Sequence, residues 1–255
     1  MPGFKDSALL ITGDDFGVSH QVNEAIEAQY LAGRLTQTSL MIHGGAVEEA
    51  VRIALRYPQL GVGLHLTLVG GTRPGRTVLT DVEGRFAPNP AVAGWRYFYR
   101  RELRGAIRLE IIEQFGLFLE RGFLPVYWDG HMHLHLHPVV FQEAESVAKN
   151  HGFQAVRLLR TQRAGCAGMM FNILSCVGMR HLDVSIVHFP CRVWGLTETG
   201  RMNDACFARA VKESRGVALG EIYYHPRMDG PVSYVVPEKV RRVSWQSWLE
   251  SDVGR

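Results

Sequence analysis

Residues 8–17 have the sequence Ala-Leu-Leu-Ile-Thr-Gly-Asp-Asp-Phe-Gly, in which an apolar run ends at two adjacent carboxylates. A short apolar run that stops at Gly and Asp is typical of a buried β-strand and its turn. A helically spaced stretch follows from Ser19, a residue suited to cap it, to about Leu31, and Gly33 lies just beyond. The opening of the chain therefore predicts a β/α unit.

The same alternation continues along the chain. Further strands are expected at 38–42, 62–68, 125–128, 155–159, 181–189 and 217–224. Helices are expected at 46–57, 102–121, 139–150 and 204–214. Strands separated by helices form right-handed β/α units around a parallel sheet, so six or seven such units predict an α/β fold with a complete or incomplete barrel. We find no linker or internal repeat, so residues 1–255 are expected to form a single domain.

Composition and charge exclude several functional classes. The 255 residues are 46% hydrophobic and have a formal net charge of +3, which is too small to predict nucleic-acid binding. The four cysteines form no C-x-x-C pair, which argues against a thiolate zinc site or a disulfide framework and favours a reducing compartment.

Membrane insertion is not expected either. No segment approaches the roughly 20 apolar residues that span a bilayer, and residues 1–6 do not resemble a signal peptide. We expect a cytoplasmic protein that at most lies peripherally at the inner membrane face. A homo-oligomer is compatible with the sequence.

Ionisable residues fall at the carboxyl ends of the expected strands, where the active sites of such folds lie. They are Asp14, Asp15, His65, Asp129, His131, His133, Arg157 and His225. For the first two, the functional interpretation is one carboxylate on a metal ion and one free as a base, because two ionised neighbours need a cation. A turn or helix start is the alternative. His65 alone fits a core histidine as well as a ligand, and Arg157 fits a buried ion pair with a carboxylate.

The segment from Asp129 to Pro138 contains four histidines at alternate positions, 131, 133, 135 and 137. In an extended chain all of them would point to one face, but successive same-face residues lie about 7 Å apart, so they cannot all bind one ion. We therefore expect one metal ligand, one or two residues in the substrate pocket and one surface residue. A histidine-rich turn without a metal is the alternative.

These residue types suit hydrolysis. One carboxylate and two imidazoles on one face of a metal leave positions open for water and substrate. No phosphate-binding glycine loop or G-x-S-x-G turn follows a strand, which argues against nucleotide chemistry and against a serine hydrolase.

Two further segments have alternative roles. Residues 95–101 combine aromatic side chains with arginines, and they fit an anionic lipid interface or the start of an exposed helix. Within them Trp95 is a candidate substrate contact. Residues 165–179 are apolar and rich in methionine, and they fit a cover for a large lipid or a buried helix of the barrel.

Short motifs in a fixed order resemble those of the YdjC-like (ChbG-type) carbohydrate deacetylases. They are Thr12–Ser19 with Val22–Asn23, Thr38–Met41, Gly63–Leu66, Asp129–His135 and His225–Pro226. The stretch Val62–Val69 and the aromatic and arginine residues after Gly94 are most similar to the hopanoid-biosynthesis branch, HpnK. The resemblance implies a seven-stranded, TIM-like (β/α) barrel related to the polysaccharide deacetylases.

The resemblance also implies site residues and an activity. Asp15, His65 and His131 would bind a divalent metal, Asp14 would act as the general base, and His225 would match a late histidine of the family. The branch implies removal of the acetyl group from an N-acetylglucosaminyl hopanoid of the bacteriohopanetriol type. Zn²⁺ is the expected ion, with Mg²⁺, Co²⁺, Ni²⁺ and Fe²⁺ as alternatives.

Within that mechanism we expect His225, or else His133, to protonate the leaving amine. Arg157 would hold Asp14 ionised and oriented. Asp129 would accept a hydrogen bond from a ligand imidazole.

Two other functions fit the sequence. One is N-deacetylation of soluble chito-oligosaccharides such as diacetylchitobiose, and the other is non-catalytic binding of a sugar or lipid by the same barrel. An apolar groove beside the metal would favour a glycolipid, whereas a polar groove with stacking aromatics would favour the soluble sugar. In each case the expected partner is an N-acetylated amino sugar rather than a nucleic acid.

Overall fold

The computed structural model describes residues 7–161, 165–184, 186–229 and 232–252. Its strands are β1 (Ala8–Phe16), β2 (Gln37–Leu40), β3 (Gly61–Leu66), β4 (Tyr127–Gly130), β5 (Ala155–Val156), β6 (Arg192–Trp194), β7 (Leu219–Tyr224) and β8 (Arg241–Val243). Its α-helices are α1 (His20–Leu31), α2 (Val47–Arg56), α3 (Pro90–Tyr99), α4 (Arg104–Glu120), α5 (Pro138–Asn150), α6 (Gly165–Met179), α7 (Asp204–Glu213) and α8 (Trp245–Asp252). Short 3₁₀ helices are η2 (Arg101–Leu103), η3 (His131–Leu136) and η4 (Leu196–Glu198).

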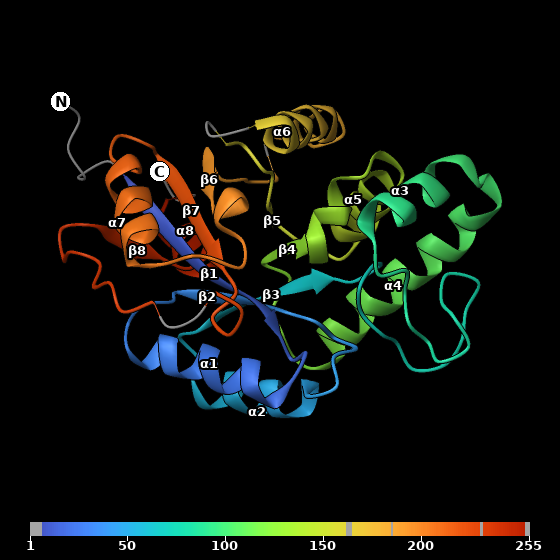
Figure 1. The fold of residues 1–255 in the computed structure, drawn as a ribbon, viewed down its shortest axis with the longest axis horizontal. Helices are drawn as coiled ribbons and strands as arrows, with labels where there is room; N and C mark the ends of the chain where they lie inside the picture. The colour runs from blue at the N-terminus through green and yellow to red at the C-terminus, as the bar shows by residue number, and fades with distance from the viewer. Residues whose placement is uncertain (1–6, 162–164, 185, 230–231, 253–255) are drawn as a thin grey trace.

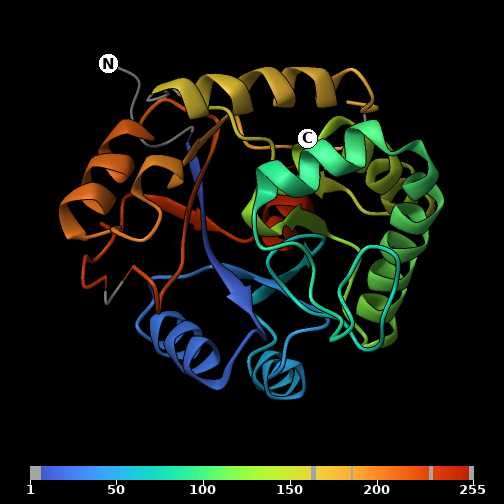
Figure 2. The same ribbon diagram turned by 45° about the vertical axis from the view of Figure 1, so that its right-hand side comes forward.

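The strands form a curled parallel sheet that the helices surround (Figures 1 and 2). The strand order is β5-β4-β3-β2-β1-β7-β6, and β8 pairs with the first residues of β1. The two edges of the sheet approach each other, because Ala155 of β5 forms a bridge with His188 and the Val193 amide of β6 donates to the Arg160 carbonyl at 2.9 Å. The predicted seven-stranded, TIM-like barrel is therefore confirmed, in the form of a half-barrel with an additional short strand.

Several expected elements differ from those observed. The strand expected at 181–189 is wrong for the residues of that range that the structure describes, which leave out residue 185: they contain a single bridge, from His188 to β5, and the sixth strand is Arg192–Trp194. The helix expected from residue 102 begins at Arg104, after the short turn η2. The sequence did not indicate α3, β8 or α8. The last two are short elements whose position depends on pairing with β1 and packing beneath it.

The apolar segment 165–179 forms a regular helix, α6, on the outside of the barrel (Figure 2). In the described ranges of the chain, no helix combines the length and the apolar character that a membrane crossing requires.

The loops that follow β1 and β2 are joined by hydrogen bonds from α1. Helix α1 begins as predicted, with the Ser19 hydroxyl accepting from the Val22 amide at 3.3 Å. Asn23, in the first turn of α1, accepts from the Gly17 amide at 2.8 Å and donates to the Ala46 carbonyl at 3.0 Å. The end of β1 is thereby fixed relative to the start of α2, and with it the two carboxylates that precede Gly17.

Close approach of these two loops predicts a difference between two adjacent glycines. A Cβ added at Gly44 would lie 2.2 Å from the Gly17 carbonyl oxygen, whereas one added at Gly45 would meet only the Val18 carbonyl oxygen, at 3.6 Å. We expect Gly44→Ala to lower the free energy of unfolding by about 1–3 kcal/mol because backbone must move to admit the methyl group. Gly45→Ala is the matched control and should change it by less than about 1 kcal/mol. Urea unfolding of both variants measures the difference, and equal midpoints would contradict the prediction.

Candidate active site

A backbone irregularity at the end of β1 turns both neighbouring carboxylates toward the same site. Successive side chains on a regular strand point to opposite faces. In β1 the pairing with β2 shifts between Gly13 and Phe16, and Asp15 has φ 68°, in the left-handed region that few residues other than Gly, Asn and Asp adopt. Asp14 and Asp15 are both buried, and both lie close to His65.

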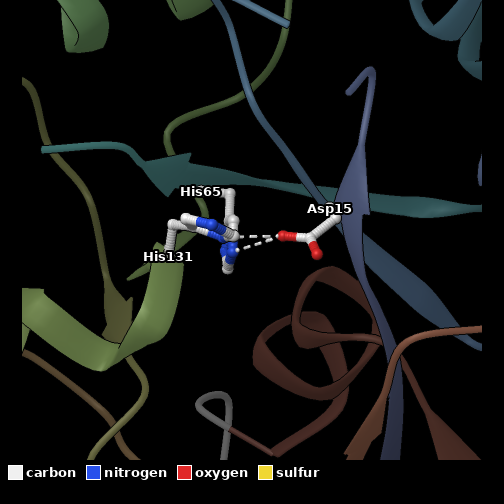
Figure 3. A group of neighbouring side chains, drawn as sticks. All are labelled: Asp15, His65 and His131. Carbon is white, nitrogen blue, oxygen red and sulfur yellow. Dashed lines mark hydrogen bonds and ion pairs between the residues drawn. The ribbon is translucent and has the colours of Figure 1, made fainter. Parts of the chain in front are cut away.

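Three side chains from separate strands converge on one point (Figure 3). Asp15 Oδ1 accepts from His131 Nδ1 at 2.8 Å and lies 3.2 Å from His65 Nε2. His65 belongs to β3, and His131 follows β4 directly. Their donor atoms lie within 4.8 Å of one another. His65 Nε2 is buried without a hydrogen-bond partner among the described residues, so it offers a lone pair or proton to the space beside Asp15. The donor set and this orphaned nitrogen fit a divalent metal ion.

Asp129 orients His65 from behind. His65 Nδ1 donates to Asp129 Oδ1 at 2.6 Å, which directs Nε2 toward Asp15. Burial alone would lower the pKa of His65, but Asp129, together with Asp15 and Asp14, outweighs burial and raises it to about 10. Because a ligating imidazole is neutral, a metal bound at this group would displace that proton. Asp129 thus accepts a hydrogen bond from His65, and its role behind a metal ligand stays a prediction.

Arg157 holds the second carboxylate. The side chain is wholly buried, and its Nη1 and Nη2 donate to the two oxygens of Asp14 at 2.8 and 3.0 Å. Ser39 of β2 donates to Asp14 Oδ1 at 3.0 Å. Burial would raise the pKa of Asp14, but Arg157 and His65 outweigh it and lower that pKa to about 2. Asp14 is therefore ionised at neutral pH, as expected for a carboxylate paired with Arg157.

The same guanidinium contacts two further acids. Arg157 Nη1 lies 2.9 Å from Asp129 Oδ2, and Nη2 donates to Glu221 Oε1 at 2.7 Å. Three buried acids, Asp14, Asp129 and Glu221, therefore share this one guanidinium. Burial raises the pKa of Glu221, and the charge of Arg157 offsets this only in part. The raised pKa of His65 supplies a second positive charge beside these acids, and a metal ion held at Asp15 would replace that charge when it displaces the proton.

His225 lies beside Asp15, directly after β7. Its Nε2 is 3.9 Å from Asp15 Oδ2, and Asp229 accepts from its backbone amide at 2.7 Å and lies 3.7 Å from its Nδ1. Burial lowers the pKa of His225, but Asp229, Asp14 and Asp15 outweigh it, and the net shift is upward. The imidazolium form is thus favoured beside the candidate metal ligands.

The histidine segment is not extended, and the histidines do not share one face. Met132 and His133 have φ values of 50° and 56° within the turn η3. His131 therefore contacts Asp15, while His133 hydrogen-bonds the Tyr223 hydroxyl at 2.8 Å. His135 donates to the Arg157 carbonyl at 2.8 Å, and His137 lies against Gly94 and Phe98 of α3.

These surroundings separate the roles of the remaining predicted residues. Burial lowers the pKa of His133, and that of His135 to about 4, so both imidazoles are neutral at pH 7. The hydrogen bond from His135 to the Arg157 carbonyl fixes the backbone of Arg157. Trp95 is exposed on α3, with its ring centroid 5.3 Å from that of Tyr99, and is not part of the cluster of acids and histidines.

Sequence reasoning missed four residues of the site: Ser39, Glu221, Tyr223 and Asp229. Tyr223 binds His133, and its ring lies 4.7 Å from the Arg157 guanidinium carbon. One signal was present, because Glu221 is a charge inside the otherwise apolar or aromatic strand 219–224. Its partner could not be found from the sequence, since the two residues are 64 positions apart.

The chain is similar to known proteins along most of its length. A profile of the YdjC-like protein family matches residues 8–251. The chain is 36% identical over 157 residues to a carbohydrate deacetylase of Geobacillus stearothermophilus, with 60% of each chain covered. It is 28% identical over 154 residues to a chitooligosaccharide deacetylase of Serratia marcescens, with 58% of each covered. The matched region thus spans no more than 60% of these relatives.

A solved structure shows the same fold. It is a candidate cellobiose-phosphate cleavage protein from Enterococcus faecalis V583, which superposes with a TM-score of 0.65 over 94% of this chain and 98% of that one. The two chains are 16% identical, so this likeness concerns the fold alone.

Metal binding can be tested without a substrate. We expect the protein to bind one divalent ion, with Zn²⁺ measured in competition with a chromogenic chelator. His65→Ala should abolish this binding because a ligand atom is lost, and Asp129→Asn should weaken it by about 10–100-fold because the hydrogen bond that orients His65 is weakened. His151→Ala, which removes an exposed histidine at the end of α5, is the control and should bind as the unmodified protein does. Undiminished affinity in His65→Ala would exclude the site.

Proposed function

The chain belongs to the YdjC-like family, and on that premise we propose that it is a metal-dependent hydrolase that removes the N-acetyl group from an amino sugar. The observation that carries the proposal is the pairing of two differently held carboxylates. Asp15 faces His65 and His131, while Asp14 beside it is ionised and bound to Arg157. A site that only bound sugar would not need an ionised carboxylate next to a metal-binding group.

The group of Asp15, His65 and His131 would hold the metal. A divalent ion held there would lower the pKa of a coordinated water toward about 7 and polarise the amide carbonyl. Zn²⁺ is the first candidate because N/O sites bind it more tightly than most divalent ions, and Mg²⁺, Co²⁺, Ni²⁺ and Fe²⁺ are the alternatives.

Asp14 is the proposed general base. Its Oδ1 accepts from Ser39 and Arg157, whereas among the described residues its Oδ2 accepts only from Arg157 Nη1, so Oδ2 keeps a lone pair for a proton. Asp14 would take a proton as water attacks the acetyl carbon. Arg157 positions the carboxylate and does not itself need to touch the substrate.

His225 is the proposed proton donor to the leaving nitrogen. Cleavage of the C–N bond leaves acetate and an amine that must gain a proton. His225 Nε2 lies 3.9 Å from Asp15 Oδ2, and Asp229 on its other side, 3.7 Å from Nδ1, raises the pKa of His225. The alternative, His133, is bound to Tyr223 and is neutral because burial lowers its pKa, so it is the weaker candidate.

We further propose a lipid-linked amino sugar as the substrate, with N-acetylglucosaminyl hopanoid as the candidate that the sequence resemblance suggests. The supporting observation is apolar surface near the histidine turn: α3 and α6 both pack against η3 and expose large apolar side chains. Soluble chito-oligosaccharides are the second candidate, which the name of the Serratia marcescens relative supports.

The base assignment makes a specific prediction. Asp14→Asn should retain the metal and lower kcat by about 10²–10⁴-fold, because the amide cannot accept the proton. The measurement is acetate release together with metal content. Asp81→Asn, in an exposed loop ion pair with Arg85, is the control and should leave both unchanged. A near-normal rate in Asp14→Asn would refute the role of Asp14 as base.

The choice of substrate is tested by acetate release from zinc-loaded protein. N-acetylglucosaminyl hopanoid in detergent and diacetylchitobiose are compared at equal concentration, with Asp15→Ala as the blank. We expect release from the lipid. Acetate release from the soluble sugar alone would support the hydrolase and refute the lipid-linked substrate. Tight binding of either compound without acetate release would indicate a non-catalytic barrel.

A further inference from the structure

Helix α6 exposes apolar side chains on the side where a surface helix usually carries charged ones. None of its 15 residues is charged. Its fully buried residues are small, namely Gly168, Ser175 and Gly178, and the half-buried Phe171, Leu174 and Met179 also pack against the core. Its large side chains Met169, Met170 and Ile173 face outward and are between 49% and 59% exposed. An outward stripe of this kind is unusual in a protein that is surrounded only by water, and it marks an interaction surface.

The polar groups of α6 are satisfied within the protein. Ser175 donates to the Leu159 carbonyl at 3.1 Å, and Asn172 exchanges two hydrogen bonds with the backbone of Thr161. Gly178 packs so closely on Phe141 that an added Cβ would lie 3.1–3.3 Å from its ring. These contacts fix the orientation of α6 on the barrel, with Met169, Met170 and Ile173 on its outer side.

Helix α3 presents a second apolar face. Val92, Trp95, Phe98 and Tyr99 are each at least 52% exposed, although Tyr97 between them is buried and donates to the Leu68 carbonyl. The rings of Trp95, Phe98 and Tyr99 lie within 5.3 Å of their neighbours, so they form one continuous aromatic surface.

Arginines border the aromatic surface. Arg100, Arg101 and Arg104 are exposed at the end of α3 and the start of α4, and no ion pair is found for them among the described residues. Glu102 is the exposed acid between them. Aromatic rings beside unpaired arginines match the boundary of an anionic bilayer, where rings occupy the headgroup region and guanidinium groups contact phosphates.

Both faces adjoin the turn that supplies a candidate metal ligand. Phe171 of α6 lies 5.5 Å from the His133 ring, and Phe98 of α3 lies 6.2 Å from the His137 ring. The two helices both pack against η3 and α5. Membrane contact here would bring the bilayer to the rim of the site rather than to the opposite side of the barrel.

We propose that the outer faces of α3 and α6, with Arg100, Arg101 and Arg104, form a docking surface for an anionic lipid bilayer. Docking itself is independent of any reaction. The further consequence, that an amphiphilic substrate reaches the site without leaving the bilayer, rests on the proposed function.

Vesicle sedimentation tests the surface with the full chain. We expect binding to vesicles of equal phosphatidylglycerol and phosphatidylcholine, weak binding to phosphatidylcholine alone, and loss of binding as salt rises. The triple variant Arg100→Gln, Arg101→Gln and Arg104→Gln should lower the partition coefficient by about 100-fold. The variant Met169→Ser, Met170→Ser and Ile173→Ser should also weaken binding, and its exposed positions make misfolding a minor concern.

Controls separate docking from chemistry and from self-association. The control Arg52→Gln with Leu55→Ser removes an exposed arginine and an exposed leucine from α2, and should bind vesicles normally. Asp15→Ala should bind vesicles but release no acetate. Vesicle binding by a protein that deacetylates neither substrate would keep the docking surface and refute the proposed activity. Failure of the unmodified protein to bind anionic vesicles would overturn the docking surface. It would also be overturned if the α6 variant bound vesicles normally but had a lower oligomeric mass, because the face would then join two copies of the chain.

Discussion

A single buried guanidinium links the parts of this site. Arg157 reaches carboxylates from three strands, Asp14 of β1, Asp129 of β4 and Glu221 of β7. A buried charge is tolerated when it is paired, and a guanidinium has the five donors that such a group of acids requires. The same contacts keep Asp14 ionised. They involve only one oxygen of Asp129, Oδ2, so the other, Oδ1, accepts the hydrogen bond that orients His65. Both the packing of the barrel core and the ionisation of Asp14 therefore depend on Arg157. Removal of this side chain would leave several buried carboxylates without a positive partner.

Around this centre, two adjacent carboxylates acquire different properties because the backbone departs from regular strand geometry. The left-handed conformation of Asp15 turns it toward the histidines, while Asp14 stays within the sheet against Arg157 and Ser39. A regular strand would send one of the two to the far face. The strain of one non-glycine residue at positive φ thus places an acid that faces two histidines beside an acid that Arg157 holds ionised.

Much of this arrangement follows from the sequence. Alternating strand and helix patterns predicted the half-barrel, and polar residues at strand ends predicted the convergence of the candidate ligands, because parallel strands end at one edge. The turn at 131–136 was not predictable, since Met132 and His133 give no local signal for positive φ. The partnership of Glu221 with Arg157 depends on closure of the sheet. Composition also could not decide the orientation of 165–179, because an apolar helix fits a core and a lipid surface equally.

That orientation has a consequence for the choice between lipid-linked and soluble substrates. Sugar hydroxyls are recognised by polar groups and by stacked rings, so a soluble oligosaccharide gives no reason to expose methionine and isoleucine on α6. The exposed faces of α3 and α6 adjoin the turn that places His131 beside Asp15. An amphiphile has its sugar and its hydrocarbon within one molecule, and it requires polar chemistry and apolar contact at neighbouring places. The proximity of the acid and histidine cluster to these helices supplies both, and this is the structural argument behind the proposal of a lipid-linked amino sugar.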